Sequence, residues 1–408
     1  MLVLLFALAR LGAILVPLNW RLTAAEHKAI LSDCSPKWIA FDADFESHAR
    51  GLGVPALVKN SSQNAEPSGQ DSDDILIVYT SGTTGKPKGA VLTQSALLWN
   101  GFNSIHAHDL SQSDHVLTAL PLFHVGGLNN QTLPALLAGA TVTLHRRFDP
   151  GQWLADVARR RPTVSLLVPA TLQAVISHPA WATTDLSSLK MLNAGSMVIP
   201  DSMIRAFHER GVPVGQIYGC TETAPIAVVL LKEDAIRKLG STGKPAPHCE
   251  VKLVEGEIWV RGPNVMRCYW NDPAGTAAAL TPDGWFKTGD LARIDDEGYY
   301  WIMGRSKDVI ISGGENIYPA ELENVLADCP AIAEAAVIGV YDPKWGEAAC
   351  AFIVRKNSID EQAVLKLFRD RLAKFKHPRR VVFLDSLPKN AMGKVQKFEL
   401  KKLLERGA

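Results

Sequence analysis

Apolar residues follow two alternating patterns up to about residue 230. Short apolar runs, typical of strands, alternate with longer stretches in which apolar residues recur at helical spacing. The expected strands are Trp38–Phe41, Ile75–Tyr79, Ala90–Leu92, Leu189–Leu192 and Val214–Tyr218. The expected helices are one that starts at a capping box, Thr23 to Glu26, and the segments Gln94–His108, Gln152–Arg160, Thr171–Ser177 and Pro200–Arg210. This alternation predicts layers of helices and sheet, an α/β arrangement.

The pattern changes in the second half of the chain. Residues 240–304 contain short strand-like runs separated by Gly, Pro and Asp, which predicts a small β subdomain. From Lys307 the order is mixed, and it ends in an expected amphipathic helix, Glu361–Lys374, and a basic tail. We therefore expect an α/β protein with a large N-terminal domain, residues 1–306, and a small α+β C-terminal domain, residues 307–408.

The first eighteen residues are almost all apolar and could be mistaken for a signal peptide. Arg10 interrupts the run, no Lys or Arg precedes it, and no small-residue cleavage site is evident. We expect instead a buried helix to Leu11, a turn at Gly12 and a strand at Ala13–Val16.

Composition narrows the class of protein. A length of 408 residues suggests two or more domains, and 47% apolar with 21% charged residues indicates a globular protein with a large core. A net charge of +1 gives no reason to expect nucleic acid or an acidic membrane as a partner. The 6 cysteines are scattered without a Cys/His cluster, so disulfides and zinc are not expected and a reducing cytoplasm fits.

One loop has the composition of a polyphosphate site. The segment Tyr79–Gly89 contains three glycines that allow a tight backbone, the hydroxyl donors Ser81, Thr83 and Thr84, and two lysines. It is not a Walker loop, because Pro87 follows Gly85-Lys86 where Ser or Thr would be required. On composition alone, an ordinary turn is an equally good interpretation.

Three further segments combine glycine with polar or aromatic side chains. Pro121–Gly127 contains His124; such a histidine is more often a core residue, but the flanking Pro and Gly favour a ligand loop. Asn193–Met197 has small residues that let a flat ligand approach the backbone, although a plain strand-to-helix turn fits as well. Tyr218–Glu222 ends in one carboxylate, which is weak support for a metal site by itself.

Taken together in this order, these segments resemble the motifs of the adenylate-forming superfamily, which includes acyl-CoA synthetases, peptide-synthetase adenylation domains and luciferases. The resemblance runs from residue 8 to residue 394 and also includes Leu8–Asn19, Gly256–Trp270, Gly284–Asp290, Gly304–Glu323 and Leu387–Lys394. In the family about seventy to ninety further residues precede the first of these segments, so the chain looks shortened. Cys268 stands where the family usually has Gly.

The resemblance implies a role for each matching residue. The ATP site would contain Thr80, Ser81, Gly82, Thr83, Thr84, Lys88, Gly195, Tyr218, Gly219, Thr221, Asp290, Arg305 and Lys394. Tyr218 would stack on adenine, Thr221 would contact the α-phosphate, and Asp290 and Arg305 would hold the ribose. Glu222 would bind Mg²⁺, which prefers one or two carboxylates with phosphate oxygens and water.

The resemblance also implies an acyl pocket and a moving lid. His124, Val125, Gly126, Ala194 and Ala224 would line the acyl pocket. Thr84, Glu222, His124 and Lys394 would be the catalytic residues, with Lys394 reaching the carboxylate and the α-phosphate. Lys307 would be the hinge of a mobile C-terminal domain, and Ser312, Gly313 and Gly314 would line the pantetheine tunnel for CoA.

The predicted activity is ATP-dependent synthesis of an acyl-CoA through an acyl-adenylate. The expected pocket segments 119–134, 193–200 and 215–231 contain no cationic side chain apart from His124, which predicts an apolar monocarboxylic acid, a fatty acid ahead of an aryl acid. Alternatives are an aryl-acid CoA ligase, an enzyme that loads a separate carrier protein, and an impaired nucleotide-binding protein. No carrier segment follows Ala408, which favours free CoA. We expect ATP, Mg²⁺ and CoA as ligands and no transmembrane segment; the oligomeric state, a homodimer included, stays open.

Overall fold

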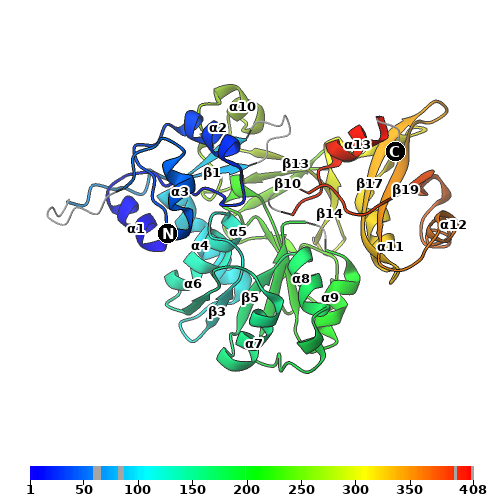
Figure 1. Ribbon diagram of the computed structural model, residues 1–408, viewed down its shortest axis with the longest axis horizontal. Helices are drawn as coiled ribbons and strands as arrows, with labels where there is room; N and C mark the ends of the chain where they lie inside the picture. The colour runs from blue at the N-terminus through cyan, green and yellow to red at the C-terminus, as the bar shows by residue number, and fades with distance from the viewer. Residues whose placement is uncertain (58–65, 81–86, 198, 390–392, 406–408) are drawn as a thin grey trace.

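The computed structural model describes residues 1–57, 66–80, 87–197, 199–389 and 393–405, and these residues form four β-sheets with helices around them (Figure 1). The largest sheet has the order β4-β3-β5-β6-β7-β8-β9. Its first five strands in this order are parallel, and β8 and β9 are antiparallel to their neighbours. The bounds are β3 (His115–Thr118), β4 (Thr141–Leu144), β5 (Val164–Leu167), β6 (Met191–Gly195), β7 (Val214–Tyr218), β8 (Val228–Val229) and β9 (Lys244–Pro245).

Helices cover both faces of this sheet. One face packs against α7 (Pro150–Arg160), α8 (Pro169–Ile176) and α9 (Asp201–His208), with Trp153 and Phe207 fully buried between them and the strands. The opposite face is covered by α4 (Gln94–His108), α5 (Val125–Gly127), the π-helical turn η2 (Leu128–Thr132) and α6 (Leu133–Leu137). The carboxyl ends of the parallel strands therefore meet at one edge, where α/β proteins place their ligands.

A second sheet joins the expected phosphate loop to a distant segment. β1 (Asp74–Thr80) and β2 (Lys88–Thr93) form an antiparallel hairpin, and β12 (Cys268–Tyr269) pairs with β2. The N-terminal helix α1 (Leu2–Arg10) contacts β1. The expectation that this helix is buried is wrong for most of it, because only Leu5 is buried and Val3 is 84% exposed. After it, Leu15 makes a single bridge to Leu76 in place of a strand.

The predicted β subdomain is a four-stranded antiparallel sheet. Its strands are β10 (Glu250–Val254), β11 (Glu257–Arg261), β13 (Phe286–Ile294) and β14 (Tyr300–Arg305). Asp290 on β13 lies directly opposite Arg305 on β14, so the pairing of these strands brings the two residues together.

The chain after residue 310 forms its own sheet and core. The order is β16-β15-β18-β17, with β19 parallel to β18, and Figure 1 shows these yellow-to-red elements as one lobe. The strands are β15 (Ile310–Ser312), β16 (Glu315–Ile317), β17 (Ile332–Asp342), β18 (Gly346–Arg355) and β19 (Arg380–Leu384), and the helices are α11 (Pro319–Ala327), α12 (Glu361–Lys366) and α13 (Lys397–Glu405). Two hydrophobic clusters, one around Phe368 and one around Phe352, contain only residues of this lobe. The exact domain boundary at 306/307 stays a prediction.

Several shorter elements complete the chain. These are α2 (Ala24–Cys34), α3 (Glu46–Arg50), α10 (Pro273–Ala279) and the 3₁₀ turns η1 (Ala43–Phe45), η3 (Pro179–Ala182), η4 (Thr221–Thr223), η5 (Ser306–Asp308) and η6 (Lys374–Lys376). The capping box of α2 is confirmed: Glu26 N donates to Thr23 Oγ1, and Thr23 N donates to Glu26.

Three expected elements differ from the structure. Trp38–Phe41 forms no strand, because its only ladder contact is one bridge, Ile39 to Ala56. The helix expected over Glu361–Lys374 ends at Lys366, and Asp370 has a left-handed backbone, φ 62°, that a continuous helix does not allow. The basic tail contains a helix, α13.

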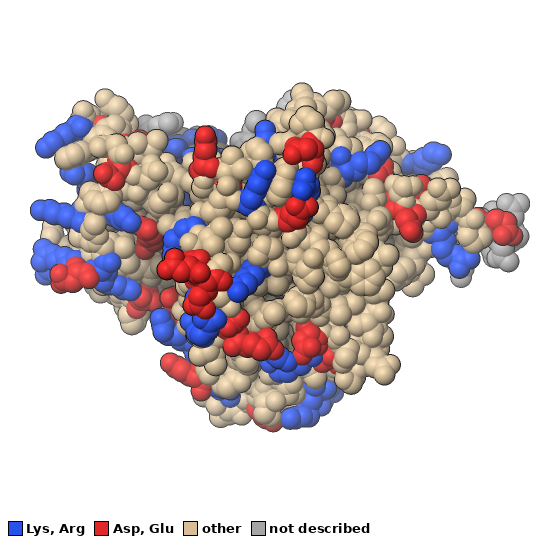
Figure 2. All heavy atoms as spheres, turned by 180° about the vertical axis from the view of Figure 1, so that it is seen from behind, with Lys and Arg blue, Asp and Glu red and all other residues tan. Residues whose placement is uncertain are grey.

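Charges of both signs are interspersed on the face seen in Figure 2, as the net charge of +1 suggests. No helix in the described part of the chain is long and apolar enough to cross a membrane.

Candidate active site

Tyr218, Asp290 and Arg305 form one connected group at the edge of the large sheet. The Tyr218 hydroxyl, at the end of β7, donates to Asp290 Oδ2 at 2.9 Å. Arg305 Nε lies 2.7 Å from Asp290 Oδ1. The Asp290 carboxylate is thereby held in one orientation between an aromatic ring and a cation, an arrangement suited to accepting hydrogen bonds from a pair of hydroxyls.

Lys394 lies within electrostatic reach of the same group. Burial lowers the pKa of the Lys394 ammonium and the charge of Arg305 lowers it further, whereas Asp290 and Glu222 act in the opposite direction. Burial raises the pKa of the Asp290 carboxyl. The charge of Arg305 and the hydrogen bond from Tyr218 lower it, but the effect of burial is larger. Lys394 precedes α13 of the C-terminal lobe, so the two parts of the chain meet at this site.

The loop after β7 is fixed by close backbone approaches. A Cβ on Gly219 would lie 1.6 Å from the Pro225 carbonyl oxygen, so only glycine fits there. Asn264 Nδ2 donates to the carbonyl oxygens of Thr223 at 2.7 Å and Ile226 at 2.8 Å. These contacts hold Thr221, which is buried in η4, at a defined position.

Glu222 is oriented by a tyrosine from a different sheet. The Tyr269 hydroxyl, on β12, donates to Glu222 Oε1 at 2.8 Å. The Lys88 ammonium lies 4.9 Å from the centre of the Tyr269 ring and 3.0 Å from Asp272 Oδ2. Burial, followed by the charge of Glu222, raises the pKa of the Tyr269 hydroxyl, so it remains a donor.

A metal ion at this place would have few protein ligands. Among the described residues, no group of three or more His, Cys, Asp or Glu side chains could hold one. One oriented carboxylate does fit Mg²⁺, which is commonly bound by one or two carboxylates together with phosphate oxygens and water.

The phosphate-loop residues Ser81, Gly82, Thr83, Thr84 and Lys86 lie outside the described residues. The residues at both ends of the loop are described. Thr80 ends β1, with its hydroxyl 3.5 Å from the Lys88 carbonyl oxygen, and Lys88 starts β2. The sequence correctly predicts that the loop connects two strands.

His124 starts the short helix α5 and is half-buried. Its Nδ1 accepts a hydrogen bond from the Gly126 backbone N–H at 3.0 Å. Burial, with a smaller effect from the charge of Lys394, lowers the pKa of the His124 imidazole to about 4. The side chain is therefore neutral at pH 7, with its proton on Nε2, which can donate to a carboxylate.

The other expected pocket residues are small or buried. Val125, Ala194 and Ala224 are buried. A Cβ on Gly195 would lie 2.5 Å from the Ile217 carbonyl oxygen, so β6 and β7 approach closely there. The segment Asn193–Gly195 belongs to β6 itself, whereas the sequence suggested that it follows the strand.

The residues predicted for the hinge and the CoA tunnel lie in the C-terminal part of the chain. Lys307 is exposed in η5, between β14 and β15. Ser312 is buried, and Gly313 and Gly314 have φ values of 61° and 87° in the two-residue turn between β15 and β16. A Cβ on Gly313 would lie 2.7 Å from the Trp345 ring, which packs on this turn.

Sequence reasoning missed the residues that orient the site. Tyr269 and Asn264 both lie in the segment Gly256–Trp270, in which the resemblance indicated no site residue. Their partners are 47 and 41 residues away, so no local pattern indicates the contacts.

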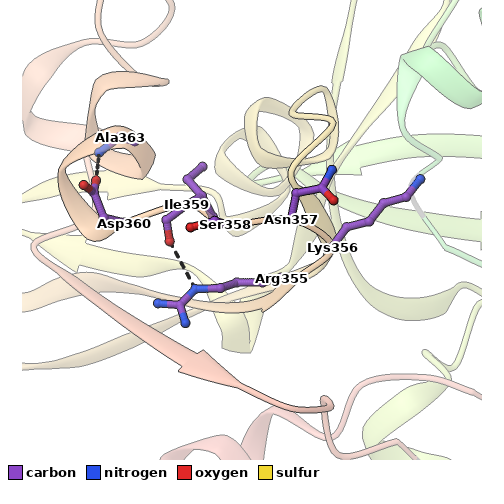
Figure 3. Close-up of a pocket in the computed structure, with 7 residues that line it drawn as sticks. All are labelled: Arg355, Lys356, Asn357, Ser358, Ile359, Asp360 and Ala363. Atoms are coloured by element: carbon purple, nitrogen blue, oxygen red, sulfur yellow. Dashed lines mark hydrogen bonds between the residues drawn. The ribbon is translucent and has the colours of Figure 1, made fainter.

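A separate hollow lies on the C-terminal lobe, and none of the predicted site residues lines it (Figure 3). Residues 355–360 and Ala363 line it, in the connection from β18 to α12. Two of its polar side chains form hydrogen bonds within this connection: Arg355 Nε donates to the Ile359 carbonyl, and Asp360 accepts from Ala363 N. We assign it no role.

The fold and the site define an AMP-binding enzyme with a C-terminal lid-like lobe. The AMP-binding enzyme family matches residues 1–270, and the AMP-binding enzyme C-terminal domain matches residues 321–394. The chain belongs to this family of AMP-forming acid–thiol ligases.

Among curated relatives, the indoleacetate–CoA ligase of Aromatoleum aromaticum is 48% identical over 100% of this chain and 86% of its own length. The feruloyl-CoA synthase of Amycolatopsis sp is 40% identical, with coverage of 98% and 85%. The long-chain-fatty-acid–CoA ligase FadD13 of Mycobacterium tuberculosis is 34% identical, with coverage of 98% and 84%.

A solved structure confirms the fold. The o-succinylbenzoate CoA synthetase of Bacillus subtilis, in complex with its acyl-adenylate intermediate, superposes with a TM-score of 0.90 at 35% identity, covering 98% of this chain and 85% of that one. The same enzyme has also been solved with ATP and a magnesium ion. The predicted superfamily, fold and ligase class are thus confirmed, whereas the roles of individual residues stay predictions.

Proposed function

We propose that this chain activates an aromatic monocarboxylic acid, with arylacetic acids first, and transfers it to CoA. The observation that carries this proposal is the 48% identity over the full chain to an indoleacetate–CoA ligase, against 34% to a fatty-acid ligase. The second aromatic relative, at 40%, points the same way. The aryl alternative is therefore better supported than the fatty acid that the sequence favoured.

The electrostatics of the predicted pocket support a substrate acid with a single carboxylate. The pocket segments contain no Lys or Arg, and their histidine, His124, is neutral at pH 7 because its pKa is about 4. A second carboxylate on the acid would be buried there without a cationic partner, which is costly. An aromatic ring would instead contact apolar walls such as Val125 and Ala224.

In the first half-reaction, a carboxylate oxygen of the acid attacks the α-phosphorus of ATP, and the bond to the β-phosphate oxygen breaks to release pyrophosphate. We assign to His124 Nε2–H the orientation of the carboxylate and to Lys394 the stabilisation of charge on the α-phosphate. Tyr218, Asp290 and Arg305 would bind the nucleoside. Glu222 would hold Mg²⁺, which when bound neutralises phosphate charge.

In the second half-reaction, the CoA sulfur attacks the acyl carbon, and the bond to the AMP oxygen breaks. The nucleophile belongs to CoA, so no cysteine of the chain is required. The half-buried Cys220 thiol fits this, because desolvation raises its pKa and keeps it protonated. We assign the change between half-reactions to rotation of the C-terminal lobe at Lys307, which would bring Ser312, Gly313 and Gly314 to the pantetheine.

The test compares kcat/KM for indole-3-acetate, phenylacetate, octanoate and malonate, measured as CoA-dependent release of AMP. We expect the two arylacetates to be preferred over octanoate and malonate to be the poorest. Preference for octanoate would restore the fatty-acid hypothesis, and preference for malonate would contradict the electrostatic argument. Replacing CoA with a carrier protein in the same assay shows which thiol the enzyme accepts.

A further inference from the structure

A narrow crevice lies beside α5, between the large sheet and η2. It is lined by Thr118, Ala119, Leu120, Gly126, Gly127, Gln131 and Leu166. Pairing of the parallel strands places Leu166 beside Asn193, on the sheet face that His108 of α4 also contacts. The crevice therefore lies against the carboxyl ends of β3 and β5, directly behind the turn that holds His124.

Gln131 is the unusual residue of this crevice. Its side chain is 1% exposed, and its Nε2 lies 3.4 Å from Asn193 Oδ1. Its Oε1 is buried and has no hydrogen-bond partner among the described residues. The crevice has no room for a water molecule, so water cannot satisfy this oxygen.

Neighbouring polar side chains in the crevice wall are satisfied. Thr118 Oγ1 lies 2.9 Å from Thr132 Oγ1, which donates to the Gly127 carbonyl at 2.7 Å. A buried acceptor without a partner is rare and calls for an explanation. Because Oε1 can only accept, the missing partner must be a donor.

We propose that Gln131 Oε1 accepts a hydrogen bond from an N–H on the aromatic ring of the acid, and so selects indole-type arylacetic acids. This inference rests on the proposed function. His124, at the start of α5, and Gln131, in η2, are seven residues apart on one short helical segment. The proposal requires a bicyclic ring, joined to its carboxylate by one methylene, to reach from His124 to Gln131.

The crevice must open for the ring to enter. Gly126 and Gly127 present no side chain on this wall, and a Cβ on Gly127 would lie 2.3 Å from the Pro121 carbonyl oxygen, so that wall is fixed backbone. Entry of the ring would require new rotamers of Leu120 and Leu166, the large apolar side chains of the lining. The amide end of Gln131 then meets the ring edge, and the ring nitrogen supplies the donor.

The competing explanation is that Gln131 only anchors η2 to β6 through Asn193. Under that explanation, replacing Gln131 would lower stability and affect all acids alike. Under our proposal, the replacement changes the ratio between acids that differ only in the ring N–H. The ratio is therefore the informative measurement.

The experiment compares indole-3-acetate with benzothiophene-3-acetate, in which sulfur replaces the N–H without added bulk, and uses phenylacetate as a reference. We expect the unmodified enzyme to prefer indole-3-acetate by about tenfold or more in kcat/KM, because the benzothiophene leaves Oε1 unpaired. Gln131→Met should bring this ratio to within about twofold by lowering indole-3-acetate turnover, with phenylacetate unchanged. If Gln131→Met does not fold, Gln131→Asn, which is one methylene shorter, should lower the same ratio.

The matched control is Asn103→Leu. Asn103 is also a buried amide side chain, but it lies on α4, outside the predicted pocket segments, and it does not line the crevice. This variant should keep the preference for indole-3-acetate. Equal kcat/KM for the two bicyclic acids, or a preference that survives in Gln131→Met, overturns the inference while the proposed function stands. Absence of activity with all three arylacetates overturns the proposed function itself.

Discussion

Replacing Tyr269 with Phe tests how Glu222 is held. The substitution removes one hydroxyl, which donates to Glu222 Oε1 at 2.8 Å, and it keeps the ring that Lys88 contacts at 4.9 Å. A hydrogen bond to a charged group contributes about 1.5–3 kcal/mol. At about 1.4 kcal/mol per factor of ten, this corresponds to a ten- to hundredfold change, which is also the usual effect of removing a side chain that orients a metal ligand.

We expect the Tyr269→Phe substitution to change the Mg²⁺ dependence of the first half-reaction. Acid-dependent ATP–pyrophosphate exchange, measured over a range of Mg²⁺ concentrations, should show a ten- to hundredfold higher requirement for Mg²⁺ and a largely retained rate at saturation. Tyr299→Phe is the matched control, because the Tyr299 hydroxyl also donates to a carboxylate, Asp234, outside the site. An unchanged Mg²⁺ requirement in Tyr269→Phe, or an equal change in the control, would refute the reasoning.

Three other predictions concern the lid and the histidine. Lys394→Ala should lose most acid-dependent pyrophosphate release but still convert supplied acyl-adenylate to acyl-CoA; equal loss of both half-reactions would contradict its assignment. Lys307→Pro should damage one half-reaction, the second, far more than the other, because proline fixes φ near −65°; normal kinetics would mean that Lys307 is an ordinary loop residue. His124 has a lowered folded-state pKa, about 4, so the unfolded chain binds its proton first, and its contribution to stability is lost as pH falls from about 6.5 to about 4. Thermal unfolding of His124→Asn over this range should show a smaller loss than the unmodified enzyme.

Much of the fold could be predicted because local signals agreed with tertiary packing. Gln94–His108 is a helix with the expected bounds, and Val214–Tyr218 is the expected strand. The failures occur where a distant contact decides the outcome. Trp38 and Phe41 have strand-forming side chains, but only Ile39 finds a bridge partner, and Phe368 is fully buried in a turn where the pattern predicted a continuing helix.

The residues of the candidate site also fall into two groups, those that the sequence identified and those that it did not. Motif residues such as Asp290 and Arg305 could be identified from the resemblance, and the structure adds that β13 and β14 pair them directly. The residues that orient Glu222 and the loop after β7 could not be identified, because Tyr269 and Asn264 act on partners 47 and 41 residues away. Sequence motifs identify the residues expected to contact a ligand. The hydrogen bonds that orient those residues depend on which strands become neighbours in the fold.

The charges at the centre of the site would give a physical reason for the predicted movement of the C-terminal lobe. Lys394 is half-buried near Arg305, and both its desolvation and the charge of Arg305 lower the pKa of its ammonium, which makes the charged form less favourable at this position. The carboxylates of Asp290 and Glu222 oppose this only in part, since Arg305 already neutralises Asp290 at 2.7 Å. The triphosphate of ATP would add negative charge beside Lys394, and pyrophosphate would remove most of it on release. We therefore expect the position of Lys394 to be favourable before the first half-reaction and unfavourable after it, so that loss of pyrophosphate itself drives the C-terminal lobe toward its second position.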